Sequence, residues 1–134
     1  GVISSIENPN HLFLSCCIER GLPSACSNNC HFATYDESFI TSVTTGVHQC
    51  PLSSLPIIQF CAAQGRDHRE CCQRNGVTTT IAGDRCLVFC DQTPDKVVPI
   101  DYTYLPCFER FRSMKQCFYS KIQSDALVHF SKRS

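Results

Sequence analysis

The sequence predicts a mostly α fold: a small disulfide-rich helical domain built from two six-cysteine pseudo-repeats, with long loops and at most short strands. The first observation is the cysteine content, twelve in 134 residues, which is near the level of a disulfide scaffold. The second is that the cysteines follow one spacing plan twice, CC-x8-C-x3-C-x19-C-x10-C and then CC-x13-C-x3-C-x16-C-x9-C. The third is that helix-capping residues surround both CC pairs.

The cysteines predicted to form disulfides are Cys16, Cys17, Cys26, Cys30, Cys50 and Cys61 in the first copy, and Cys71, Cys72, Cys86, Cys90, Cys107 and Cys117 in the second. The repeat predicts one domain over residues 8–130, with a first half of residues 8–66, a second half of residues 67–130, and tails at 1–7 and 131–134. A half of this size builds a poor core alone. Disulfides compensate, at about 2–4 kcal/mol each.

The first CC pair is predicted to lie in a helix over residues 8–20. Asn8 is a favoured N-cap residue and Pro9 suits the first helical position. Gly21 stands where helices often end in a left-handed residue.

The second CC pair is predicted to lie in an equivalent helix over residues 67–76. Asp67 and Glu70 have the D-x-x-E spacing of a capping box, so we interpret them as helix-cap residues rather than as paired acids. Gly76 is expected to end the helix.

Each C-x3-C motif is predicted to occupy one helical turn. Ser24 and Asp84 stand two residues before the first cysteine of their motifs, and both are favoured N-cap types. Because residues i and i+4 are neighbours on a helix, the two thiols of each motif are expected to face the same partner element.

The long connections at residues 31–49 and 91–106 are rich in Thr, Val, Tyr and Pro and have no clean 3.6-residue period. They are predicted to be extended loops with at most a short strand pair. Between them, Pro51 is expected to open a helix, which Pro56 then limits or kinks.

The segment from Pro106 to about Phe130 is predicted to be an amphipathic helix. Its apolar stripe comprises Cys107, Phe111, Met114, Phe118, Ile122 and Ala126. The basic residues Arg110, Arg112, Lys115 and Lys121 lie mostly off the stripe. They form either a solvated outer face or a docking face for an acidic partner or an anionic glycan.

The cysteines and their neighbours resemble the DB module. The similarity extends over about residues 8–120, and no cysteine is missing. The residues that carry it are Cys16-Cys17, Cys26-x3-Cys30, Cys50, Cys61, Cys71-Cys72-x3-Gly76-Val77, Cys86-Leu87-Val88-Phe89-Cys90, Cys107 and Cys117.

The DB module has twelve cysteines thought to form six disulfides, and it occurs in secreted and surface proteins of invertebrates, often beside immunoglobulin and fibronectin type III domains. The resemblance implies an extracellular protein and brings no established biochemical role with it. The CC and C-x3-C helices are also similar, at fold level only, to the helical disulfide domains of GDNF-family receptor alpha chains.

Disulfide connectivity is only partly constrained by the sequence. Six cysteines allow fifteen pairings within one half. Adjacent cysteines rarely bridge, and a C-x3-C pair within one helix seldom has suitable geometry, which leaves about ten. We hypothesise that each half closes on itself and that both halves use the same pairing.

Metal binding and catalysis are weaker interpretations. His68-x2-Cys71 has a spacing found among zinc ligands, but two CC pairs and a doubled framework favour disulfides. Neither CC pair is followed by the His-Asp dyad of secreted phospholipase A2, and no G-x-S-x-G elbow occurs. We interpret the histidines as surface or capping residues; they are His11, His31, His48, His68 and His129.

The sequence therefore predicts a protein that is not an enzyme and that binds no metal ion and no cofactor.

Composition restricts the location and the partners. Twelve Lys and Arg balance twelve Asp and Glu, so no global charge attracts nucleic acid. No apolar run reaches the length of a membrane span. Disulfides persist in oxidising compartments, and we interpret the chain as a mature or trimmed secreted form without an Asn-x-Ser/Thr sequon.

Two functions remain open. The first is a secreted or cell-surface recognition module that binds another extracellular protein through the basic helix and the two long connections. The alternative is a carrier of a lipid or another apolar ligand, which would need an apolar cavity.

Overall fold

The computed structural model describes residues 8–92 and 100–133. Within these ranges every regular element is a helix, which confirms the predicted fold class. The elements are α2 (Pro9–Glu19), α3 (Ser24–Ser27), α4 (Glu37–Thr44), η1 (Leu52–Ser54), α5 (Leu55–Ala63), α6 (Arg69–Arg74), η2 (Val77–Thr79), η3 (Gly83–Phe89), η4 (Tyr102–Arg110) and α7 (Phe111–Arg133), where η denotes a 3-10 helix. Asp67 and Asp91 add one isolated antiparallel bridge.

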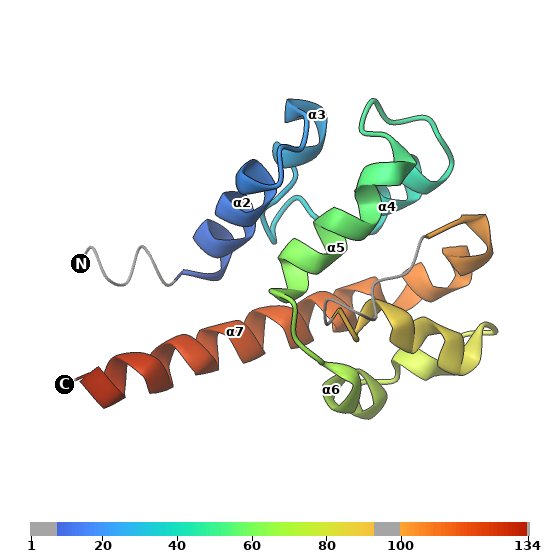
Figure 1. Cartoon of the computed structure of the whole chain (residues 1–134). Coiled ribbons are helices and arrows are strands. Elements are labelled where there is room, and N and C mark those ends of the chain that lie inside the picture. The colour runs from blue at the N-terminus through green and yellow to red at the C-terminus, as the bar shows by residue number, and fades with distance from the viewer. Residues whose placement is uncertain (1–7, 93–99, 134) are drawn as a thin grey trace.

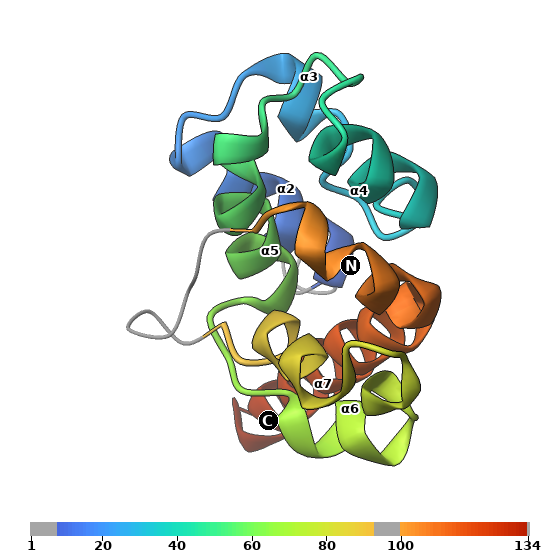
Figure 2. The same ribbon diagram turned by 90° about the vertical axis from the view of Figure 1, so that its right-hand side faces the viewer.

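The long helix α7 connects the two halves of the chain. It contacts α2 and α5 from the first half, and α6, η2 and η4 from the second. In Figures 1 and 2 the helices of the first half lie above α7, while α6 lies below it. Side chains of both halves therefore pack against one helix.

Helix α2 forms as the sequence predicts. The Asn8 side chain accepts a hydrogen bond from the backbone N–H of Asn10 (2.8 Å), and Pro9 occupies the first turn. The helix ends at Glu19, and Gly21 has a φ of 72°, in the left-handed region that glycine adopts without strain.

Helix α6 differs from its predicted equivalent at the N-terminus. It begins at Arg69 with His68 in the cap position and no side-chain cap, so the predicted capping box is wrong. Asp67 lies outside the helix, where its carboxylate accepts hydrogen bonds from the backbone N–H (3.0 Å) and the guanidinium of Arg69. Glu70 instead lies 3.5 Å from Arg74, one turn along α6.

The C-x3-C motifs do not form single α-helical turns with both thiols on one face. Helix α3 already ends at Ser27, and η3 is a 3-10 helix that ends before Cys90. The predicted caps at Ser24 and Asp84 are also wrong, because Pro23 and Ala82 occupy those positions. The two cysteines of each motif consequently reach different partner elements.

The connection at residues 31–49 contains a helix, α4, which corrects its prediction as an extended loop. The Asp36 carboxylate caps this helix by accepting a hydrogen bond from the Phe39 N–H (2.9 Å). Phe39, Ile40 and Val43 are buried. Burial of this apolar face outweighs the low helix propensity of its β-branched residues.

The later proline predictions are partly correct. Pro51 precedes the short η1 rather than opening an α-helix, and Pro56 lies in the first turn of α5 without breaking it. The C-terminal helical segment begins earlier than predicted. In the connection at residues 91–106, positions 93–99 lie outside the described residues. The 3-10 helix η4, which precedes α7, already begins at Tyr102, whereas the helix was predicted to start at Pro106. The predicted apolar stripe is buried through Ile122, and Ala126 lies beyond the described side chains.

The disulfides pair identically in the two halves, as hypothesised. Numbering the cysteines of each half from one to six, the bonds are 1–6, 2–4 and 3–5. They are Cys16–Cys61, Cys17–Cys30 and Cys26–Cys50 in the first half, and Cys71–Cys117, Cys72–Cys90 and Cys86–Cys107 in the second. All twelve cysteines are paired, and none of the bonds crosses between the halves.

A chain of aromatic side chains is one non-covalent connection between the halves. Phe13 contacts Tyr35 at 5.2 Å between ring centroids, and Tyr35 contacts Phe111 of α7 at 4.8 Å. Phe111 then contacts Phe108, and Phe108 contacts Phe89 of η3. This aromatic chain is almost completely buried. The buried Tyr35 hydroxyl donates a hydrogen bond to the Gln59 side chain, and burial raises the pKa of Tyr35, so the ring stays neutral.

Candidate functional site

Three of the four predicted basic residues gather at one open recess of about 560 Å³, which we call the α4–α7 recess. It lies where the start of α4 faces the junction of η4 and α7 (Figure 2). Its lining residues are Asp36, Glu37, Ser38, Glu109, Arg110, Phe111, Arg112, Ser113 and Lys115. The structure therefore brings together Arg110, Arg112 and Lys115.

Lys115 has a structural contact in addition to its charge. Its Nζ donates a hydrogen bond to the backbone carbonyl of Phe32 (2.6 Å), which fixes the chain before α4 against α7. Burial lowers the pKa of Lys115, and the nearby Arg112 lowers it further, whereas Asp36 acts in the opposite direction. Lys115 is thus partly buried, and one of its N–H donors is already used by the Phe32 carbonyl.

Of the three basic side chains on the α4–α7 recess, Arg112 is the one most available to a partner. It is exposed, and within the described part of the chain its guanidinium has no hydrogen bond or ion pair. Arg112 also lines a neighbouring hollow of about 270 Å³ together with Phe32 and Tyr119. Arg110, in contrast, donates through Nε to the Thr79 hydroxyl (3.1 Å).

The recess carries acids that sequence reasoning did not include. Asp36, Glu37 and Glu109 line it together with the three bases, so its formal charge is balanced rather than basic. Asp36 is engaged as the cap of α4, while Glu37 and Glu109 are exposed. The acidic residues Asp36 and Glu37 stand just before the apolar Phe39, a pattern typical of the N-terminus of a capped helix, and this signal could have predicted α4.

Lys121 lies in a different place. Its Nζ is 3.5 Å from the Asp125 carboxylate, and it lines a second open recess of about 330 Å³, which we call the α6–α7 recess. The lining residues of this recess are Asp67, His68, Glu70, Cys71, Arg74, Cys117, Ser120 and Lys121. The four predicted basic residues therefore do not form one surface.

His68 lines the α6–α7 recess and is only 3% exposed. Of the two predicted roles, a surface residue or a capping residue, the first is wrong, and His68 occupies the N-cap position of α6 without a side-chain cap hydrogen bond. Its Nε2 donates a hydrogen bond to the Ala63 carbonyl (3.0 Å), and its ring packs at 4.9 Å from that of Phe118. Burial lowers the pKa of His68, and nearby Arg66 and Lys121 act in the same direction. The Ala63 carbonyl and Asp67 oppose them.

We expect the stability of the fold to decrease as the pH falls below about 6.5, the ordinary pKa of histidine. Because the folded-state pKa of His68 is lowered, the unfolded chain binds a proton there that the folded chain does not, and stability is lost in that range. The measurement is urea unfolding between pH 5 and 7.5, with His68→Gln as the comparison. An equal pH slope in this variant would contradict the assignment to His68.

The cysteines are not available as metal ligands, because all of them are in disulfides. In the described residues, no group of three or more His, Cys, Asp or Glu side chains is arranged to hold a metal ion. Over the same residues, no helix is both long and apolar enough to cross a bilayer.

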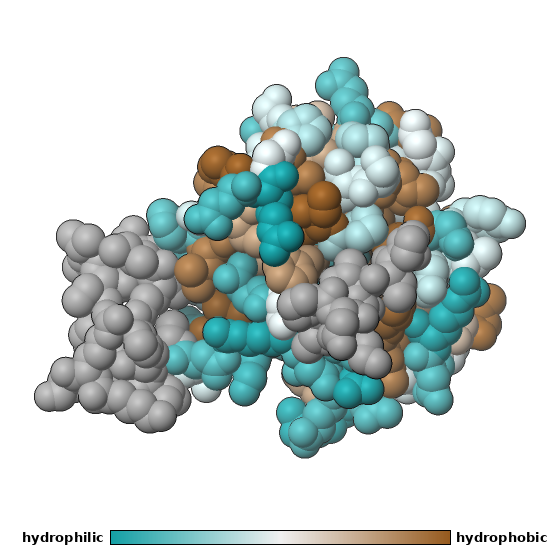
Figure 3. Space-filling view, in the orientation of Figure 1, coloured by the Kyte–Doolittle hydropathy of each residue, from teal (hydrophilic) through white to brown (hydrophobic). Residues whose placement is uncertain are grey.

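Exposed apolar residues are dispersed rather than gathered into a ligand cavity. Leu14 and Ile18 lie one turn apart on α2 and are 41% and 62% exposed. In Figure 3 the hydrophobic surface on this face is interrupted by hydrophilic side chains. Both named recesses are open to solvent and lined mainly by polar or charged residues.

The comparison with known families gives one match. The profile of the DB module matches residues 16–118, a range that includes all twelve cysteines. No curated protein and no solved structure matches the chain.

Proposed function

The chain belongs to the DB module family, an extracellular cysteine-rich family that is not known for enzymatic activity, and we propose that it is a secreted or cell-surface recognition module. In this proposal residues 8–130 act as one non-enzymatic unit that binds another extracellular protein.

Rigidity supports this proposal. Three disulfides close each half, and the aromatic chain connects the halves through α7. A rigid frame lowers the conformational entropy that binding would otherwise cost, so exposed side chains on it can bind without reordering the backbone.

The α4–α7 recess is the proposed contact surface. The choice rests on the Arg112 guanidinium, which has no hydrogen bond or ion pair to any residue that the structure describes. An exposed guanidinium can bind a partner carboxylate through two parallel hydrogen bonds. Glu37 and Glu109 on the same recess would complement a basic side chain. The recess therefore fits a protein surface that presents charges of both signs, rather than a uniformly acidic partner.

The lipid-carrier alternative has less support. The buried apolar side chains fill one continuous core, and the two named recesses are open to solvent and lined mainly by polar or charged residues. A carrier would enclose an apolar cavity.

The test is a binding screen of the oxidised protein against an array of extracellular domains, followed by charge reversal. We expect Arg112→Glu to weaken binding of the identified partner about tenfold or more, since a lost ion pair at an interface contributes at least about 1.4 kcal/mol. Arg74→Glu is the control, because Arg74 is also exposed but lies on α6 and not on the α4–α7 recess.

Unchanged binding by Arg112→Glu would remove the recess from the proposal. An array with no bound partner, together with native mass spectrometry that detects co-purified lipid, would favour the carrier instead.

A further inference from the structure

Two of the six disulfides differ from the others in exposure. Ten of the twelve cysteines are at most 1% exposed. The two that are partly exposed are Cys16 and Cys71. They hold the same position in the two halves, the first cysteine of the CC pair, and form the two 1–6 bonds, Cys16–Cys61 and Cys71–Cys117. A thiol in solution can therefore reach these two bonds more easily than the other four.

The surroundings of the two 1–6 bonds are not equivalent. In the first half, Arg20 stands four residues after Cys16 and places its guanidinium over the Phe60 ring, 4.6 Å from the centroid. Within the described residues, no N–H donor contacts the sulfur of Cys16 or Cys61.

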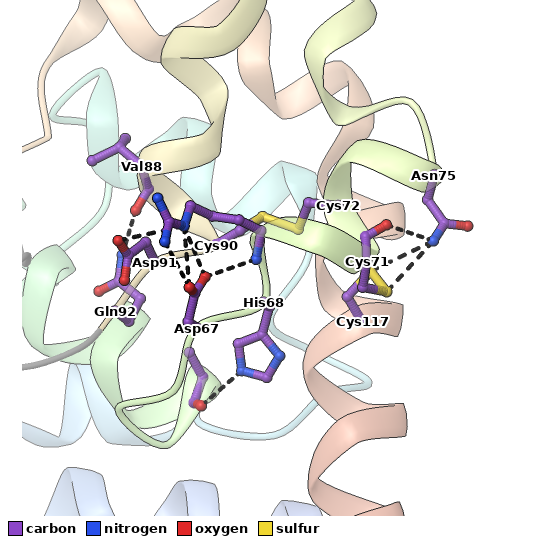
Figure 4. Close-up of a disulfide and its surroundings, with 12 residues drawn as sticks. Asp67, His68, Cys71, Cys72, Asn75, Val88, Cys90, Asp91, Gln92 and Cys117 are labelled. Carbon is purple, nitrogen blue, oxygen red and sulfur yellow. Dashed lines mark hydrogen bonds and ion pairs between the residues drawn. A yellow bond between two sulfur atoms is a disulfide. The ribbon is translucent and has the colours of Figure 1, made fainter.

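In the second half, Asn75 occupies the position that corresponds to Arg20. Its Nδ2 donates to the backbone carbonyl of Cys71 (2.8 Å), which fixes the amide, and lies 3.5 Å from the Cys71 sulfur and 3.7 Å from the Cys117 sulfur (Figure 4). An amide N–H beside a sulfur stabilises the negative charge that develops when the disulfide breaks. A leaving thiol with a lower pKa departs faster.

The α6–α7 recess gives access to the Cys71–Cys117 bond, since both cysteines line it. Lys121 follows Cys117 by one helical turn and lines the same recess. It shares the Asp125 carboxylate with Arg66, so these three groups keep a net positive charge that favours a thiolate there. The acids of the recess are neutralised by neighbours: Asp67 by Arg69 at 2.8 Å, and Glu70 by Arg74 at 3.5 Å. The charges of this recess therefore do not repel an incoming thiolate.

We propose that Cys71–Cys117 is the thiol–disulfide exchange site of this protein, open to small extracellular thiols while the other five bonds stay intact. The thiolate of the reagent attacks the Cys71 sulfur and forms a mixed disulfide. The Cys71–Cys117 bond breaks, its electron pair stays on the Cys117 sulfur, and this thiolate takes a proton from water. A second thiol molecule releases Cys71 as a thiol and leaves as the oxidised reagent.

The inference is independent of partner binding and is tested on the whole oxidised protein. Native protein is exposed to a series of reduced glutathione concentrations, quenched with an alkylating reagent, and mapped by peptide mass spectrometry. We expect Cys71 and Cys117 to be modified first, about fivefold or more ahead of Cys16 and Cys61, because one net hydrogen bond corresponds to a ratio of about that size.

Two variants test the cause. Asn75→Leu should slow exchange at Cys71–Cys117 about fivefold, and Lys121→Gln should slow it as well. Arg20→Leu, at the matched position of the first half, should leave that rate unchanged. A loosened fold cannot imitate these results, because it would speed exchange.

Three results would overturn the proposal. They are earlier opening of Cys16–Cys61 or of a buried disulfide, simultaneous opening of all six bonds, and an Asn75→Leu variant that exchanges as fast as the unmodified protein.

Discussion

Full reduction of the six disulfides is expected to unfold the chain in the absence of denaturant. Ten of the 28 buried apolar residues of the described ranges are disulfide-bonded cysteines, so the bonds form a large part of the core itself. Each contributes about 2–4 kcal/mol, whereas a whole domain is stable by only about 5–15 kcal/mol.

The measurement is circular dichroism before and after reduction and alkylation. The far-ultraviolet helical signal should fall to that of an unfolded chain, and the near-ultraviolet aromatic signal should disappear. Oxidised protein treated with the alkylating reagent alone is the control. A reduced and alkylated chain that keeps its native spectrum would contradict the central role of the disulfides.

Phe111→Ala is expected to destabilise the fold by about 3–5 kcal/mol, the usual cost of truncating a buried Phe. Phe111 is 1% exposed and contacts Tyr35 on one side and Phe108 on the other. Since none of the disulfides crosses between the halves, the loss of this ring weakens their direct connection. We therefore expect unfolding to become less cooperative as well as easier.

Guanidinium unfolding with intact disulfides, followed by both near- and far-ultraviolet signals, measures this effect. Tyr102→Ala is the matched control, because Tyr102 is an aromatic residue of η4 that is 73% exposed; its replacement should change stability by less than about 0.5 kcal/mol. Equal effects of the two variants would show that the aromatic chain does not connect the halves.

Local signals in the sequence determined the helix of the first CC pair and the C-terminal helix, whereas the capping box predicted for the helix of the second CC pair is wrong. Asn8, Pro9 and Gly21 act on backbone groups one turn away at most, so their effect can be predicted without the rest of the fold. The buried stripe of α7 follows from its period alone.

The candidate site depended on contacts that periodicity does not contain. Arg112 and Lys115 were predicted, but their recess forms only because α4 lies opposite them, and α4 was predicted as a loop. The charge of the recess is balanced by Asp36 and Glu37, which come from the start of α4, together with Glu109. Glu109 is far from the other two in the sequence and meets them only in the folded chain. Lys121 belongs to another recess because α6, not α4, lies against that part of α7.

The sequence by itself determined that the cysteines serve as a duplicated disulfide framework, because twelve ordered positions with two CC pairs leave few other uses for the thiols. Only the tertiary structure decided which cysteines pair and how far each bond is exposed. The reason is physical: a disulfide needs two Cα atoms about 4.4–6.8 Å apart, and that proximity is set by the packing of helices that are distant along the chain.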